Sequence, residues 1–159
     1  MTTAVYAGSF DPVTKGHLDI LRRSTEIFDK VIIAVANNPE KKCLLSVNER
    51  IELIKICTQK ISGTEVFSFD GLTVDFAKKH NASVLIRGLR NTSDFEYENQ
   101  LAQINMSLDG NIQTVFLISK QEYSFISSSC IRELISHKCD LSAFVPEEIK
   151  SFLYRKFSY

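Results

Sequence analysis

The chain has 159 residues, and hydrophobic residues make up 44% of them. This length and apolar fraction predict one globular domain spanning residues 1–159. The 19 Lys and Arg residues balance the 19 Asp and Glu residues, which argues against a nucleic-acid-binding protein that relies on a general basic field. No apolar run approaches the ~20 residues needed to cross a bilayer, and no signal peptide is visible, so we expect a cytoplasmic protein without a membrane partner.

The cysteines predict neither a structural metal nor a disulfide framework. The four of them, at positions 43, 57, 130 and 139, form no C-x-x-C pair and have no zinc-finger spacing to the histidines. Free thiols in a reducing compartment are therefore expected.

Strand-like and helix-like patterns alternate along the chain from its N-terminus. Ala4–Ala7 is a short apolar run that predicts a buried strand, and the tight turn Gly8–Pro12 ends it. The apolar run after Lys30 does not alternate with polar residues, which predicts a strand covered on both faces, as in a parallel sheet. Further strands are predicted over residues 65–69, 83–86 and 114–118, and helices from 18 onward, over 46–60, 72–80 and 91–108, and from 126 and 146 onward.

End signals and apolar stripes support these helices. Ser46 and Glu49 have the spacing of a capping box, and Asn91–Asp94 can cap a helix. Apolar stripes are expected in the first helix at Leu18, Ile20, Leu21, Ile27 and Phe28, and in the last helix at Ile149, Phe152, Leu153 and Phe157. Five strand–helix alternations joined by short loops predict an α/β protein with a doubly wound, five-stranded parallel sheet flanked by helices.

In such a sheet, ligands bind beyond the carboxyl ends of the strands, near the switch in strand order. The residues after the predicted strands are Gly8–Asp11 with His17, then Asn37, Asn38, Lys41 and Lys42, then Asp70–Thr73, then Arg87–Arg90, and finally Tyr123–Ser129. Basic side chains, a histidine and two hydroxyl-rich helix starts thus converge on one edge of the sheet. This composition suits a ligand with several phosphates, because helix N-termini and cations both favour anions.

Each of these features also has a simpler interpretation. His17 could only cap its helix, Lys41 and Lys42 could form a solvated loop, and the three serines could be a cap with its loop. Arg87 follows an apolar strand end, where a charge needs a partner, and this favours a functional role.

Other site types receive no support from the sequence. The chain has no G-x-G-x-x-G fingerprint, no G-x-x-x-x-G-K-[ST] loop and no nucleophile elbow. Asp94, Glu96 and Glu98 resemble a solvated acidic face, although their closeness to Arg90 would also let them orient it.

Two motifs resemble the signatures of the nucleotidyltransferase superfamily, which has a Rossmann-like fold. G-S-F-D-P with T-K-G-H, over residues 8–17, resembles its T/H-x-G-H signature, and I-S-S-S-C-I-R, over 126–132, resembles its I-S-S-[ST]-x-[IL]-R signature. N-P-E-K-K (38–42), L-I-R-G-L-R (85–90) and D-F-E-Y-E (94–98) extend the resemblance to the bacterial phosphopantetheine adenylyltransferase family. Small departures are Ser9, where many relatives have threonine, and Cys43, where proline is common.

The resemblance implies transfer of AMP from ATP to 4′-phosphopantetheine, which gives 3′-dephospho-coenzyme A and pyrophosphate in coenzyme A biosynthesis. The acceptor phosphate is itself a nucleophile, so catalysis needs positioning and charge stabilisation rather than a covalent enzyme nucleophile. The resemblance further implies one nucleotidyltransferase domain over residues 1–159, Mg²⁺ carried with ATP and no metal-binding residues in the protein, and a homohexamer. It admits coenzyme A as a feedback ligand.

The resemblance also assigns residues to roles. His17 would donate a hydrogen bond to the α-phosphate, with Lys41 and Arg90 as the other catalytic residues. The acceptor-binding residues would be Ser9, Lys41, Thr73, Arg87 and Asn105. The ATP-binding residues would be Ser9, Phe10, His17, Gly88, Leu89, Arg90, Glu98, Tyr123, Ser124, Phe125, Ile126, Ser127, Ser128 and Ser129. The choice of Lys41 over Lys42 depends on the alignment of one loop.

Two other functions stay open at this point. One is a nucleotidyltransferase with another small acceptor, such as nicotinamide mononucleotide or glycerol phosphate, and the I-R-G-L-R and E-Y-E block argues against it. The other is a non-catalytic nucleotide sensor, which would not need His17, Lys41, Arg87 and Arg90 together.

Overall fold

The computed structural model describes residues 1–38 and 42–158. It contains one parallel sheet of five strands: β1 (Thr3–Gly8), β2 (Lys30–Ala36), β3 (Thr64–Phe69), β4 (Val84–Leu89) and β5 (Gln113–Ile118). The helices are α1 (Lys15–Ile27), α2 (Val47–Thr58), α3 (Thr73–Lys79), α4 (Thr92–Leu108), the 3₁₀ helix η1 (Gln121–Tyr123), α5 (Ser128–Ser136) and α6 (Glu147–Phe157).

The strand order is β3-β2-β1-β4-β5. The chain builds outward from β1 to β3 and then returns to start β4 on the other side of β1, which makes the β1–β4 pair the switch point of the sheet. This order confirms the predicted doubly wound α/β fold.

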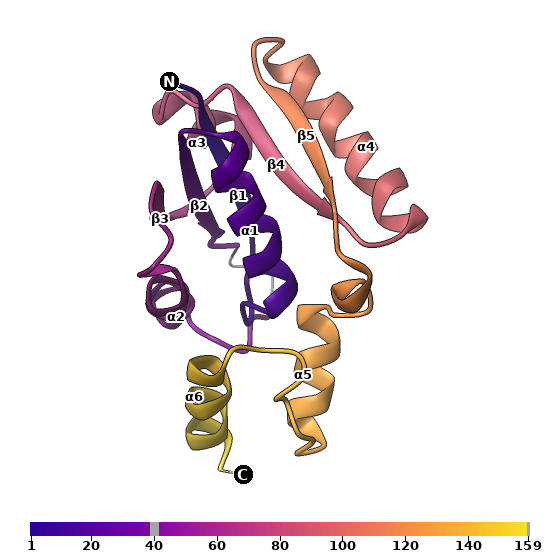
Figure 1. The fold of residues 1–159 in the computed structure, drawn as a ribbon. Helices are drawn as coiled ribbons and strands as arrows, with labels where there is room; N and C mark the ends of the chain where they lie inside the picture. Colours follow the sequence, from indigo (N-terminus) through magenta and orange to yellow (C-terminus); the bar gives the residue numbers. More distant parts are fainter. Residues whose placement is uncertain (39–41, 159) are drawn as a thin grey trace.

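The sheet is covered on both faces because alternate residues of its central strands point in opposite directions. Ala4 and Tyr6 of β1 join a cluster that includes buried residues of α1, α2, α5 and α6. Val5 and Ala7 join a second cluster with α3. α5 and α6 lie beyond the carboxyl ends of the strands, whereas α4 runs alongside β5 (Figure 1).

Local signals in the sequence explain where several helices begin. The Ser46 hydroxyl accepts the N–H of Glu49 and the Glu49 carboxylate accepts the N–H of Ser46, so the predicted capping box is present. Asn91 caps α4 by accepting the N–H of Asp94. Ser127 caps α5 in the same way, which confirms the capping interpretation of the first serine.

Three features of the sequence-based fold need correction. β4 continues to Leu89, so Arg87 lies within the strand instead of after it. The predicted stripe of α1 fails at Ile27, which is 59% exposed, whereas Phe28, the C-cap residue, packs against the core. The 3₁₀ helix η1 was not predicted. By contrast, Ile149 and Leu153 of α6 are fully buried, as their stripe predicts.

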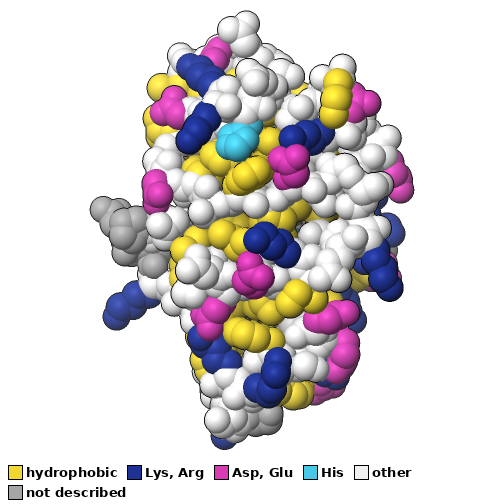
Figure 2. All heavy atoms as spheres, turned by 90° about the vertical axis from the view of Figure 1, so that its left-hand side faces the viewer, with side chains coloured by type: hydrophobic (Ala, Val, Ile, Leu, Met, Phe, Trp, Pro, Cys, Tyr) yellow, Lys and Arg dark blue, Asp and Glu magenta, His cyan; other side chains and the backbone are white. Residues whose placement is uncertain are grey.

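The side of the molecule that carries β3, α2 and α6 has a mixed surface. Lys and Arg side chains alternate with Asp and Glu side chains there, and hydrophobic atoms lie between them (Figure 2). In the described part of the chain, no helix combines the length and the apolar character that crossing a membrane would require. All four cysteines have free thiols.

Candidate active site

A pocket of about 550 Å³ opens at the carboxyl ends of β1 and β4, at the switch point of the sheet. Many of the predicted site residues line it, which confirms that they converge on one edge: Ser9, Phe10, His17, Arg87, Gly88, Arg90, Glu98, Tyr123, Ile126 and Ser127–Ser129. Elements from the whole length of the chain therefore contribute to one site.

Other predicted site residues lie elsewhere. Leu89, Ser124 and Phe125 are next to lining residues in the sequence but do not line the pocket themselves. Thr73 begins α3 and Asn105 belongs to α4, two helices that contact each other. Lys41 falls outside the described residues, whereas its neighbour Lys42 lines the pocket.

The start of α1 holds His17 in a defined orientation. Thr14 is the N-cap residue, and its hydroxyl accepts the N–H of His17 at 3.3 Å. In return, the Nδ1 atom of His17 accepts the backbone N–H of Thr14 at 3.0 Å. A backbone N–H can only donate, so Nδ1 carries a lone pair, and the proton of the neutral ring is on Nε2. Capping and a functional role are thus compatible, because the cap uses Nδ1 and leaves Nε2–H available to a ligand.

The surroundings of His17 keep its ring neutral. Burial, together with the positive charges of Arg90 and Arg87, lowers the pKa of His17 to about 4. The ring also packs edge to face against Phe10, with 5.1 Å between ring centroids, and Phe10 packs in the same manner on Tyr6. At neutral pH, His17 therefore offers an uncharged Nε2–H donor, and it lines the pocket.

Arg87 is held in place by an acidic residue of α4. Its Nε donates to the Glu98 carboxylate at 2.6 Å, its Nη2 donates to the second oxygen of Glu98, and its Nη1 donates to the carbonyl of Ala7. Burial disfavours the charged guanidinium, but Glu98 outweighs this effect and raises the pKa of Arg87. Arg87 thus has the partner that its position requires, and it retains N–H groups for a ligand.

Arg90 has an equivalent partner four residues along the chain. Its Nε and Nη2 donate to the two carboxylate oxygens of Asp94 at 2.8 and 2.9 Å. These hydrogen bonds lower the pKa of Asp94, although its partial burial acts in the opposite direction. The interpretation of the acids as a solvated face is therefore wrong for Asp94 and Glu98, which orient the two arginines, and it holds for the exposed Glu96.

The N-terminus of α5 supplies hydroxyl and backbone donors. The Ser128 hydroxyl donates to the carbonyl of Pro12, and the Ser129 hydroxyl accepts from Nη2 of Arg132. Within the described part of the chain, nothing accepts the N–H of Ser128 or Ser129. These two N–H groups and the helix dipole favour an anion in the pocket.

Asp11 and Arg132 are site residues to which sequence reasoning gave no role. Asp11 is 1% exposed, and its carboxylate accepts the N–H groups of Leu44 and Leu45 at 2.7 and 2.9 Å. Arg132 donates to the backbone carbonyl of Asp11 at 2.9 Å and lines the pocket. Asp11 thereby anchors the segment that follows Lys42, and Arg132 adds a cation. The arginine that ends the I-S-S-S-C-I-R motif was the available signal.

Two glycines permit the close packing around this pocket. A Cβ at Gly8 would lie 3.1 Å from the Phe10 ring, and a Cβ at Gly88 would lie 3.2 Å from Ile20 of α1. Both distances are tighter than ordinary carbon contacts. The glycines therefore let the first turn fold back on β1 and let α1 approach β4.

The carboxylates of the described residues that line the pocket are all engaged. Asp11, Asp94 and Glu98 line it, but each carboxylate is already bonded to backbone N–H groups or to an arginine. Among residues 1–38 and 42–158, no cluster of three His, Cys, Asp or Glu side chains could hold a metal ion.

Comparison with known proteins places these features in a group of enzymes. Residues 5–134 match the model of the cytidylyltransferase-like family. A phosphopantetheine adenylyltransferase of Desulfitobacterium hafniense is 49% identical over 157 residues, which cover 99% of this chain and 96% of that protein. Enzymes with the same name from Caldanaerobacter subterraneus and Clostridium botulinum are 49% and 48% identical, with 98% and 97% of their lengths covered.

One solved structure supports the fold independently. A putative nicotinate-nucleotide adenylyltransferase from Vibrio parahaemolyticus superimposes with a TM-score of 0.72 over 98% of this chain and 93% of that one. The sequence identity is 16%, so this likeness bears on the Rossmann-like architecture alone.

Proposed function

The chain belongs to the phosphopantetheine adenylyltransferase family of nucleotidyltransferases, and from this we propose how its pocket transfers AMP from ATP to 4′-phosphopantetheine. The products are 3′-dephospho-coenzyme A and pyrophosphate, so the enzyme acts in coenzyme A biosynthesis. An oxygen of the acceptor phosphate forms the new bond to the α-phosphorus of ATP. The bond from that phosphorus to the bridging oxygen breaks, and pyrophosphate leaves.

The observation that carries this proposal is the neutral, oriented imidazole of His17 beside two arginines. In this proposal its Nε2–H donates to an α-phosphate oxygen, where negative charge accumulates in the transition state. The ring acts neither as nucleophile nor as base, because the acceptor phosphate is already anionic. Arg87 and Arg90 supply the positive charge that lets two anions approach each other.

We divide the remaining roles by position in the pocket. Arg87 binds the acceptor phosphate together with Lys41, which lies outside the described residues. Arg90 and the N-terminus of α5 stabilise the departing pyrophosphate, with Arg132 as a further cation. Ser9 and the backbone of Phe10 hold phosphates of ATP. The further predicted contacts stay predictions: Thr73 and Asn105 for the pantetheine arm, and Gly88, Leu89, Glu98, Tyr123, Ser124, Phe125 and Ile126 for the nucleotide.

The family uses ATP, and a divalent metal accompanies this substrate. Since the described carboxylates in the pocket are engaged, we propose that the ion is Mg²⁺ and that it enters on the triphosphate as part of the substrate. The chain's own residues then bind the phosphate oxygens that the ion leaves free.

An exposed apolar stripe on α4 supports self-association. Tyr97, Ile104 and Leu108 are 61%, 54% and 50% exposed and are separated by seven and four residues, so they lie on one face of the helix. Ala102 is the one buried residue of this helix. We propose that the stripe lies in an interface of the homohexamer that family membership implies. Family membership also favours one nucleotidyltransferase domain over residues 1–159, a cytoplasmic location and coenzyme A as a feedback ligand.

An acceptor panel tests the proposed function. The purified enzyme is supplied with ATP and Mg²⁺, and pyrophosphate release is measured with 4′-phosphopantetheine, nicotinamide mononucleotide or glycerol phosphate as acceptor. We expect release with 4′-phosphopantetheine alone. Preference for another acceptor would overturn the substrate, and ATP binding without turnover of any acceptor would indicate a nucleotide sensor.

A further inference from the structure

Arg50 is a buried cation on α2 without an acidic partner among the described residues. It is 3% exposed, and none of their ion pairs includes it. Its Nη1 donates to the carbonyls of Ser9 and Ala36 at 2.8 and 2.9 Å, and its Nε is buried without a hydrogen-bond partner. Burying a charge that no opposite charge neutralises is costly. An anion bound at the opposite end of a peptide group to which Arg50 donates would offset part of that cost.

The carbonyl of Ser9 belongs to the peptide unit that joins Ser9 to Phe10. In this planar trans unit, the carbonyl and the N–H of Phe10 point in opposite directions. Ser9 and Phe10 line the pocket, whereas Arg50 does not. The hydrogen bond from Arg50 holds the Ser9 carbonyl toward α2. The N–H of Phe10 therefore points away from α2 and toward the pocket.

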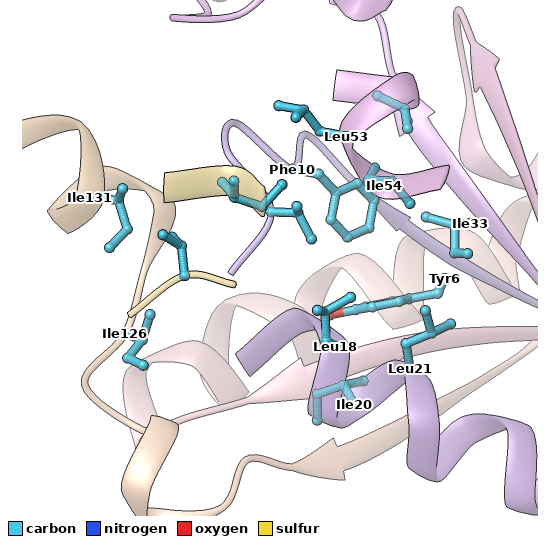
Figure 3. Close-up of a cluster of buried hydrophobic side chains, with 14 of the residues drawn as sticks. Tyr6, Phe10, Leu18, Ile20, Leu21, Ile33, Leu53, Ile54, Ile126 and Ile131 are labelled. Atoms are coloured by element: carbon cyan, nitrogen blue, oxygen red, sulfur yellow. The ribbon is translucent and has the colours of Figure 1, made fainter. Parts of the chain in front are cut away.

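The N–H of Phe10 is an available donor with little freedom to move. Among the described residues, nothing accepts a hydrogen bond from it. Phe10 has a φ of 48°, in the left-handed region that non-glycine residues rarely adopt. Its ring is buried in the cluster that contains Leu53 and Ile54 of α2, one turn beyond Arg50 (Figure 3). Packing and the Arg50 hydrogen bond thus fix the same peptide from two sides.

We infer that Arg50 is a positioning residue for the bound nucleotide: it orients the Ser9–Phe10 peptide so that the N–H of Phe10 donates to a phosphate oxygen. This inference rests on the proposed function, in which this pocket holds ATP. The guanidinium also polarises the peptide, because consecutive hydrogen bonds strengthen one another, and so makes the N–H a better donor. Arg50 acts entirely through the backbone and does not touch the ligand.

The test compares ATP and adenosine binding to Arg50→Met, which keeps a long apolar side chain and removes the donor and the charge. We expect the Kd for ATP to rise about tenfold or more, the effect of losing a charge-assisted interaction, while the Kd for adenosine stays within about twofold. Arg50→Lys should fall between the wild type and Arg50→Met. Lys55→Met is the matched control, since Lys55 lies on the same helix, is exposed and forms an ion pair with the exposed Glu52.

A second measurement does not depend on the variants folding. In the wild-type protein, the amide proton of Phe10 should move downfield in NMR spectra when pyrophosphate or ATP is added. A static Phe10 resonance, an ATP Kd for folded Arg50→Met within twofold of wild type, or equal weakening of ATP and adenosine would overturn the inference. If the acceptor panel fails while ATP binding still depends on Arg50, the proposed acceptor is wrong and this inference stands.

Discussion

The Nδ1 atom of His17 accepts the backbone N–H of Thr14 at 3.0 Å, and this contact decides what the histidine can do. It fixes the tautomer with the proton on Nε2 and prevents the ring from rotating. It also ties the proposed catalytic group to the first turn of α1, because the imidazole that completes the capping box with Thr14 is the one that lines the pocket. The start of α1 therefore positions the Nε2–H group that we propose as the donor in the active site.

Removing the imidazole of His17 should slow the chemical step and leave nucleotide binding nearly intact. We expect His17→Ala to lower kcat by a factor on the order of 10² to 10³ or more, as for loss of one transition-state donor, with only a small change in the Kd for ATP. Steady-state kinetics and equilibrium binding measure the two effects. The exposed His137 offers a control in His137→Ala, and near-wild-type turnover of His17→Ala would refute the central role.

The protonation of His17 should be displaced far below that of an ordinary histidine. Because the pKa of His17 is about 4 in the folded protein and the ordinary pKa of histidine is 6.5, the unfolded chain binds more protons between these values. This group therefore lowers the free energy of unfolding as the pH falls from 6.5 toward 4, and His17→Gln should remove that contribution. ¹⁵N NMR should show the neutral Nε2–H tautomer at pH 6.5, where an ordinary histidine is already half protonated. Titration near pH 6.5, or a proton on Nδ1, would contradict the assignment.

Arg87 should matter more for the acceptor than for ATP. Arg87→Ala removes a charged phosphate donor and leaves the Glu98 carboxylate unpaired beside the pocket. We expect the KM for 4′-phosphopantetheine to rise about tenfold to a hundredfold, and the KM for ATP to rise much less.

The double variant Arg87→Ala/Glu98→Gln separates the two causes of this effect. It should recover part of the loss, because the repelling carboxylate is gone. Equal increases in the KM for ATP and for the acceptor in Arg87→Ala would contradict the proposed division of roles.

The exposed stripe of α4 should govern assembly. Ile104→Glu places a charge in the middle of the stripe. We expect it to dissociate the proposed hexamer into smaller species, because burying an unpaired carboxylate is strongly unfavourable. Size-exclusion chromatography with light scattering measures the mass. Gln103→Glu adds the same charge beside the stripe and should keep the assembly. An unchanged mass for Ile104→Glu would exclude this face from the interface.

Features that depend on nearby residues could be predicted from the sequence. The strand runs, the capping box at Ser46 and the caps at Asn91 and Ser127 are local patterns, and the structure contains them. The convergence of the strand-end residues also followed, because parallel strands place their carboxyl ends at one edge of the sheet. The patterns predicted the fold, the two superfamily motifs indicated a nucleotidyltransferase, and the further blocks at 38–42, 85–90 and 94–98 indicated the family.

Tertiary structure decided the partners of Arg87 and Arg50, whereas Arg90 pairs with Asp94 only four residues along the chain. Glu98 bonds to Arg87 because α4 packs beside β4. Arg50 of α2 donates to the carbonyl of Ser9 in the turn after β1, and the two residues are 41 positions apart in the chain. Periodicity records which residues are apolar, but it does not record which polar groups face each other across elements. The sequence by itself therefore determined the architecture and the reaction class, whereas packing between distant elements determined the protonation of His17 and the placement of its supporting charges.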